Sequence, residues 1–132
     1  SAASDVYKRQ TLYLKSYHTG VMKEGDVINI NVARGYMKGI DYRLIHLAPS
    51  KDLFYWYRNN MNRPDWFSIY CKRYMNQFKT DPKAIDELNE IKHLLDQGRN
   101  VCIYCFCRDV NKCHRGIIGH LFSKKGYNIT VL

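Results

Sequence analysis

The sequence has no apolar run of about 18 residues, the length that a membrane-spanning helix requires. It also lacks a charged and then apolar leader with a small-residue cleavage site, the pattern of an export signal. Internal repeats and low-complexity tracts are absent as well. These absences exclude a membrane-spanning protein and a repeat array, and they predict a soluble cytoplasmic protein. The 132 residues suit one domain with a single core.

An even, well-spaced set of cysteines is also missing. The chain has five cysteines, and four of them crowd into residues 102–113. Disulfide frameworks use even numbers of cysteines in exported proteins, so this pattern indicates reduced thiols in the cytoplasm. We interpret Cys71 and Cys102 as core residues, because a free cysteine behaves as a small hydrophobe.

The first ten residues differ from the rest of the chain. Asp5 to Gln10 match the translation of a transposase adapter used to build sequencing libraries, and they show no apolar periodicity. We therefore predict that residues 1–10 are an artefactual or disordered tail and that residues 11–132 form a single α/β domain. The adapter also indicates a metagenomic origin.

Positive charge dominates the composition. The chain has 21 Lys and Arg residues against 12 Asp and Glu residues, a formal net charge of +9. The basic residues are scattered and match no nucleic-acid-binding motif. This charge predicts an anionic partner, either a phosphate-bearing small molecule or a nucleic acid.

Short apolar runs alternate with helical periodicity along the chain. A proline or a capping residue begins three of the expected helices, and glycines end the last two. Strand, helix and strand in this order need crossover connections, which favours a parallel sheet. We predict a single three-layer α/β domain, with a largely parallel sheet and helices on both faces. The expected strands are 12–14, 27–32, 101–107 and 127–132, and the expected helices start near 50, 64, 81 and 113.

The segment 101–115 holds the most chemistry. It combines a buried strand, a polar loop and the start of a helix, so its functional side chains gather at the carboxyl end of the sheet. Cys113 lies at the helix start beside His114 and Arg115, where positive surroundings favour a thiolate. We predict Cys113 as a nucleophile and His114 as a general acid or base, and the alternatives are a packing thiol and a helix cap.

An anion site is expected around these residues. The forked guanidinium group of arginine suits phosphate or carboxylate. The candidate arginines follow expected strands, so they should lie together at the carboxyl edge of the sheet. A zinc site built from Cys105, Cys107, Cys113 and His114 is the alternative, although structural zinc sites use pairs borne on turns. No cofactor is assigned. The expected anion ligands are Ser16, Arg34, Arg108 and Arg115, and Cys105 and Cys107 are expected to line the pocket.

Several segments together match a known pattern. They are Leu14-Lys-Ser-Tyr17, Val32-Ala-Arg-Gly35, Leu47-Ala-Pro-Ser50, Tyr70 and Tyr74 with Phe78, and Cys105 followed eight residues later by Cys113-His-Arg115. On these residues the chain resembles the domain-of-unknown-function 488 family from Thr11 to its end. The family pattern has an acidic residue where this chain has Cys107. The resemblance implies a small α/β fold of bacteria, archaea and phages and strengthens the site, but it implies no reaction.

Three functions fit these observations. The first is a thiol-dependent enzyme that acts on a phosphorylated or nucleotide substrate, with Cys113 and His114 as its catalytic residues. The second is a binding module that holds a nucleotide or nucleic acid without chemistry. The third is a phage or host accessory protein that docks a partner through residues 54–57.

Overall fold

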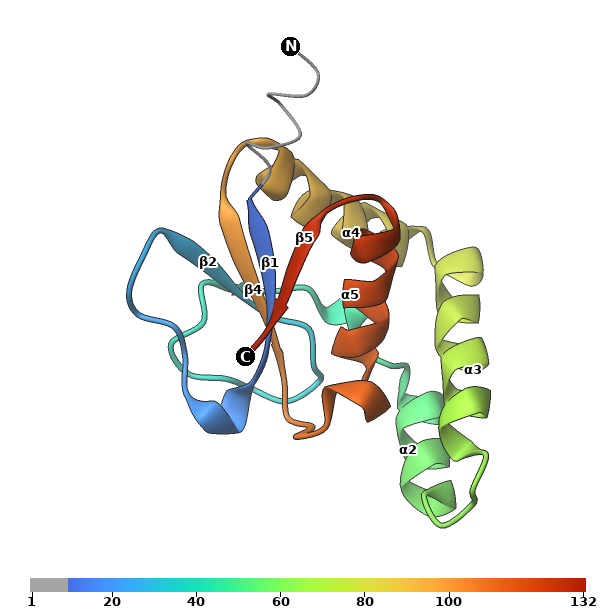
Figure 1. Ribbon diagram of the computed structural model, residues 1–132. Coiled ribbons are helices and arrows are strands. Elements are labelled where there is room, and N and C mark those ends of the chain that lie inside the picture. The colour runs from blue at the N-terminus through green and yellow to red at the C-terminus, as the bar shows by residue number, and fades with distance from the viewer. Residues whose placement is uncertain (1–9) are drawn as a thin grey trace.

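The computed structural model describes residues 10–132, and it contains one parallel sheet of five strands. The strand order is β3-β2-β4-β1-β5, and every neighbouring pair is parallel (Figure 1). This confirms the prediction of a single α/β domain with a parallel sheet. The predicted tail lies, apart from Gln10, outside the described residues. The strands are β1 (Thr11–Ser16), β2 (Val27–Asn31), β3 (Tyr42–Arg43), β4 (Asn100–Cys105) and β5 (Asn128–Val131).

The helices begin close to where the capping residues predict them. Ser50 caps α2 by accepting a hydrogen bond from the Leu53 amide, and Asp81 caps α4 in the same way from Lys83. Between residues 10 and 132, no helix is long and apolar enough to cross a membrane. The helices are α2 (Lys51–Asn60), α3 (Trp66–Thr80), α4 (Pro82–Asp96) and α5 (His114–Lys124), with short 3₁₀ turns at η1 (Tyr17–Thr19), η2 (Ile45–Leu47) and η3 (Val110–Lys112).

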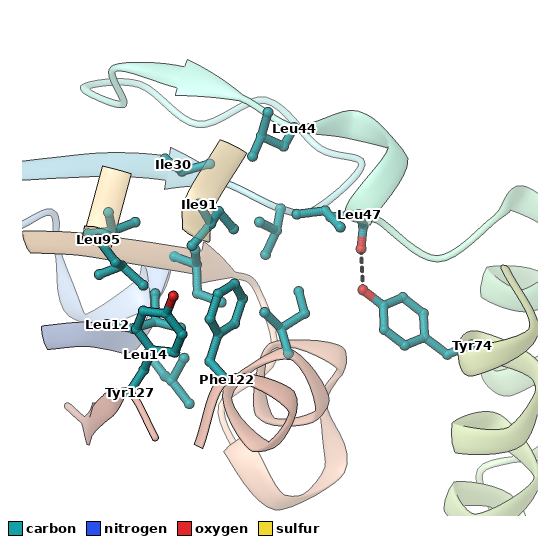
Figure 2. Close-up of a cluster of buried hydrophobic side chains, with 14 of the residues drawn as sticks. Leu12, Leu14, Ile30, Leu44, Leu47, Tyr74, Ile91, Leu95, Phe122 and Tyr127 are labelled. Carbon is teal, nitrogen blue, oxygen red and sulfur yellow. Dashed lines mark hydrogen bonds between the residues drawn. The ribbon is translucent and has the colours of Figure 1, made fainter. Parts of the chain in front are cut away.

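The main core lies on one face of the sheet. In β1 every second residue is buried, so Leu12 and Leu14 point to the same side. Ile91, Leu95 and Phe122 of α4 and α5 pack against that side (Figure 2). All four α-helices contribute buried residues to this cluster.

Tyr74 ties α3 to the core. Its buried hydroxyl donates a hydrogen bond of 2.6 Å to the carbonyl of Leu47, which Figure 2 shows as a dashed line. Tyr70, one turn earlier, is buried too, so both tyrosines of the family pattern on this helix contribute to the core.

The other face of the sheet is covered by loops, where the sequence predicts helices. Tyr104 of β4 lies there, and its hydroxyl bridges the Asn29 side chain (2.7 Å) and the Met22 amide (2.9 Å). Met22 and Met37 come from the connections before and after β2 and pack against this tyrosine. The prediction of helices on both faces is wrong in this respect, because those two connections, 17–26 and 32–41, contain no α-helix.

Candidate active site

The candidate site lies where three strands end at the same edge of the sheet. β1 and β4 end on paired residues, Ser16 and Cys105, and β2 is the other neighbour of β4. The chain then passes through a short loop and the η3 turn into α5, which starts at His114. This topology brings the residues that follow β2 and β4 next to the first turn of α5.

Cys105 occupies the centre of the site. Its Sγ lies 2.7 Å from the Sγ of Cys113 and 2.9 Å from Nη1 of Arg115. Cys105 and Arg115 are each only 1% exposed. The thiol of Cys105 therefore shares a closed environment with one thiol and one guanidinium group.

Arg115 has no carboxylate partner within the described residues, 10–132. Its Nη1 also donates to the carbonyl of Cys107 (2.8 Å), and its Nη2 donates to that of Arg108 (3.4 Å). None of the ion pairs formed within residues 10–132 includes Arg115, and its buried Nε has no hydrogen-bond partner there. A buried cation requires a counter-charge. The Sγ of Cys105, as a thiolate, is the group in contact that supplies one.

The electrostatics favour this assignment of charge. Hydrogen bonds from the thiols of Cys107 and Cys113 lower the pKa of Cys105, and the positive charge of Arg115 acts in the same direction. Burial and the hydrogen bond to Cys105 instead raise the pKa of Cys113. The expected lowering of the Cys113 pKa is therefore wrong, because its sulfur is buried and lies 2.7 Å from the sulfur of Cys105.

His114 is held in one tautomer. Its Nε2 lies 2.6 Å from the carbonyl oxygen of Val32, which can only accept a hydrogen bond, so Nε2 carries the proton. Burial lowers the pKa of His114, which favours the neutral ring. Its Nδ1 is then free to accept, and it lies 3.8 Å from the Sγ of Cys113.

A cavity of about 200 Å³ opens beside these residues. Cys105 and His114 belong to its lining, whereas Cys113 and Arg115 lie behind it. The guanidinium of Arg34 also reaches the cavity and donates to the carbonyl of Pro49 (3.1 Å). The lining consists of Ala33, Arg34, Gly35, Pro49, Phe54, Tyr57, Tyr70, Cys105, Phe106, Cys107 and His114.

The other predicted site residues lie around this cavity in different ways. Cys107 is half-buried in the lining, and Arg108 is exposed on the loop after β4. Ser16 is buried, and its Oγ has no hydrogen-bond partner among residues 10–132. Cys102 lies in the core, and burial raises the pKa of Cys102 to about 11.

The predicted zinc ligands come together only in part. Donor atoms of Cys105, Cys113 and His114 lie within 4.8 Å of one another, and Cys107 is not part of this group. The guanidinium of Arg115 contacts Cys105 Sγ from 2.9 Å. A cation so close to a ligand sulfur opposes the binding of a second cation, so the arrangement fits a thiolate paired with arginine better than a metal.

Sequence reasoning missed the aromatic walls of the cavity. Tyr70 was expected in a core stripe, and Phe54 and Tyr57 in a surface for docking a partner, yet all three line the cavity. Helical spacing reports which face of a helix is buried, and it does not distinguish a core from the wall of a cavity. One sequence signal was available. Pro49 and Ser50 begin the helix that carries Phe54 and Tyr57, and they belong to the family pattern.

One of the comparisons with known proteins identifies a family. A family model described as the active DUF488-N3 subclade, DUF488-N3a, matches residues 12–126. No curated protein and no solved structure matches the chain. The matched range runs from β1 through α5 and includes every site residue described above. The chain therefore belongs to the DUF488 family, in its N3a subclade.

Proposed function

We propose that this protein is a thiol-dependent enzyme in which the thiolate of Cys105 is the nucleophile. The observation that carries the proposal is the contact between Cys105 Sγ and Arg115, a buried guanidinium with no carboxylate partner within residues 10–132. A thiolate is a far stronger nucleophile than a thiol, and a nearby cation stabilises it. The description of the matched subclade as active also supports an enzyme.

The neighbours of Cys105 supply the remaining roles. Cys113 keeps its proton and donates to Cys105, so it serves as the acid. Nδ1 of neutral His114 lies 3.8 Å from the Sγ of Cys113 and accepts a proton during the hydrolysis step. The catalytic role first predicted for Cys113 thus passes to Cys105, and His114 keeps its role in proton transfer.

The reaction is a substitution through a covalent intermediate. Cys105 Sγ forms a bond to an electrophilic carbon of the substrate, and the bond from that carbon to the leaving group breaks. Cys113 gives its proton to the leaving group. Water then attacks the adduct, the S–C bond breaks to restore the Cys105 thiolate, and the proton from water returns to Cys113 with the help of His114.

The substrate group that enters the site is small. The cavity of about 200 Å³ is smaller than the pockets of about 300–1,000 Å³ that hold whole drug-sized ligands. The exposed Arg108 and the cavity-lining Arg34 lie near the site and are suited to an anionic part of the same substrate.

A generic acyl donor tests the nucleophile. We expect p-nitrophenyl acetate to give a burst of nitrophenolate stoichiometric with the protein, because the thiolate attacks the ester carbonyl and nitrophenolate leaves. Peptide mass spectrometry should find the acetyl group on Cys105. Cys105→Ser should abolish the burst, whereas Cys71→Ser, a change outside the site on α3, should keep it. Acetylation of Cys113 in the unaltered protein, or the absence of a burst, would show that the proposal is wrong.

A further inference from the structure

We infer that the cavity beside Cys105 binds a nucleobase, and that the cations at its rim hold the phosphate of the same nucleotide. The inference rests on the proposed function only where it places the base next to the nucleophile. Binding itself depends on three other features of the cavity, which are its aromatic walls, its unpaired hydroxyls and its charge.

Four aromatic residues line the cavity. The ring centroid of Tyr57 lies 5.5 Å from that of Phe54 and 5.5 Å from that of Tyr70, and both pairs are nearly perpendicular. These rings come from α2 and α3, whereas Phe106 lines the cavity from the loop after β4. A planar ring between them gains stacking and edge contacts, as unstacked bases do in nucleotide pockets.

Phe106 is suited to stack on a ligand. It is 36% exposed, and its ring meets Tyr17 edge to face at 5.7 Å. Its ring also approaches Gly35 so closely that a Cβ there would lie 2.6 Å from Cε2. Because Gly35 has no side chain, the ring of Phe106 can lie at the cavity, where a base can stack on it.

The cavity also contains hydroxyl groups without partners. Tyr70 is 3% exposed, and within residues 10–132 neither its hydroxyl nor that of Tyr57 makes a hydrogen bond. Burial raises the pKa of Tyr70 and of Tyr57, so both hydroxyls keep their protons and remain donors. A tyrosine hydroxyl at the cavity can donate to the acceptor atoms at the edge of a base.

The charge around the cavity fits a phosphate. Arg34 lines the cavity, and Arg58 lies over the Phe54 ring with its Cζ 5.4 Å from the centroid. No carboxylate of residues 10–132 lines the cavity. The whole chain carries a net charge of +9. Because about 200 Å³ holds a base and little more, the phosphate lies outside, at these arginines.

Calorimetric titration with mononucleotides tests the inference. The probes are the nucleoside 5′-monophosphates of the common bases, with ribose 5-phosphate as the control that lacks a base. We expect at least one mononucleotide to bind and ribose 5-phosphate to bind at least tenfold more weakly. Equal binding of the two would reduce the site to a phosphate site and overturn the inference, as would the absence of binding to every mononucleotide and to the oligonucleotide below.

Two variants place the base in the cavity. Phe106→Ala should weaken binding by roughly 5- to 150-fold, the range for the loss of one stacking partner. Tyr70→Phe keeps the ring, and should weaken binding severalfold through the loss of its hydroxyl. The control is Tyr55→Ala, which removes a 62% exposed aromatic of α2 that does not line the cavity. If Phe106→Ala and Tyr55→Ala bind alike, the base does not lie in the cavity.

A further titration distinguishes a free nucleotide from a nucleic-acid strand as the ligand. Thymidine monophosphate is compared with a short single-stranded thymidine oligonucleotide at two salt concentrations. Much tighter binding of the oligonucleotide, with a steep salt dependence, identifies a nucleic-acid strand as the ligand, and similar affinities identify a free nucleotide. The acetylation burst and the binding of mononucleotides are measured separately on the unaltered protein. Absence of the burst with intact binding therefore contradicts only the proposed function, and an intact burst without binding contradicts only this inference.

Discussion

Arg115 is the residue on which the chemistry of the site depends. It is buried and bonded to two carbonyls and one sulfur, and within residues 10–132 it forms no ion pair with a carboxylate. The sequence predicted this arginine as a ligand for an external anion. In the proposed mechanism its position instead makes the thiolate of Cys105 its anion, and Arg34 is the arginine that meets the substrate.

Replacement of Arg115 tests this pairing. Arg115→Met removes the positive charge, and the apparent pKa of Cys105 should rise toward the free value of about 8.5. The protein should also lose about 3–5 kcal/mol in the free energy of unfolding, because a buried charge pair is broken. For Arg115→Lys, the pKa of Cys105 and the free energy of unfolding should both lie between those of Arg115→Met and of the unaltered protein. The measurements are the pH dependence of Cys105 alkylation and urea denaturation.

Arg108→Met is the matched control, because Arg108 is exposed on the same loop. It should change neither the apparent pKa of Cys105 nor the stability by more than a few tenths of a kcal/mol, about the range for surface changes. An unchanged alkylation profile in Arg115→Met would show that the guanidinium does not stabilise the thiolate.

At the scale of elements, α5 places the site by its close approach to β1. Gly119 of α5 faces Leu14 of β1, and a Cβ on Gly119 would lie 2.5 Å from Leu14 Cδ1. Only a residue without a side chain lets the helix lie this close to the sheet. The close contact holds the first turn of α5, with Cys113 and Arg115, beside the end of β4.

Gly119→Ala should destabilise the protein although alanine favours helices. The gain in helix propensity is about 1 kcal/mol, and overpacking against Leu14 costs about 1–3 kcal/mol. The control is Ser123→Ala on the exposed side of the same helix, which should change stability little. Adding Leu14→Val to Gly119→Ala should recover part of the loss, because it removes the clashing Cδ1. Urea denaturation that finds Gly119→Ala more stable than the unaltered protein would contradict this packing.

The elements differ in how well the sequence predicts them. α4 is predicted well because Asp81 and Pro82 begin it and its apolar residues repeat every three or four positions. β3 is missed because it has only two residues, both exposed, and so no alternation. The loop-covered face is missed because the periodicity of a strand shows that a face is buried and does not show what covers it.

In the site, residue spacing predicts which side chains meet, and packing determines which of them make direct contacts. The spacing of Cys105 and Cys113, at a strand end and a helix start, predicts that they meet. It does not predict which sulfur contacts Arg115, and that contact decides which one is the thiolate. The sequence also does not predict that Tyr57 and Tyr70 line the cavity, because this depends on how α2 and α3 lie relative to the end of the sheet.

At the scale of the whole molecule, the hydrophobic core and the candidate site occupy different parts of the fold. All four helices lie on one side of the sheet, with α4 and α5 against the strands, and loops cover the other face (Figure 1). The carboxyl ends of β2 and β4 meet the α2 and α5 region at one edge, and there the thiolate, the cavity and the arginines come together. A basic chain that presents a nucleophile in an aromatic cavity is suited to an anionic ligand with a planar ring.

The pH dependence of alkylation at Cys105 tests the central claim most directly. Labelling rates for each cysteine with iodoacetamide, read by mass spectrometry from about pH 5 to about pH 10, report the thiolate fraction of each thiol. A lowered pKa keeps Cys105 a thiolate below the free value of about 8.5, so its labelling should stay fast at pH 6 to 7 (about two units below), where Cys71 and Cys113 label slowly. In urea the profile of Cys105 should return to the free value. Faster labelling of Cys113 than of Cys105 in the folded protein, or a Cys105 profile that already follows the free value, would contradict the account.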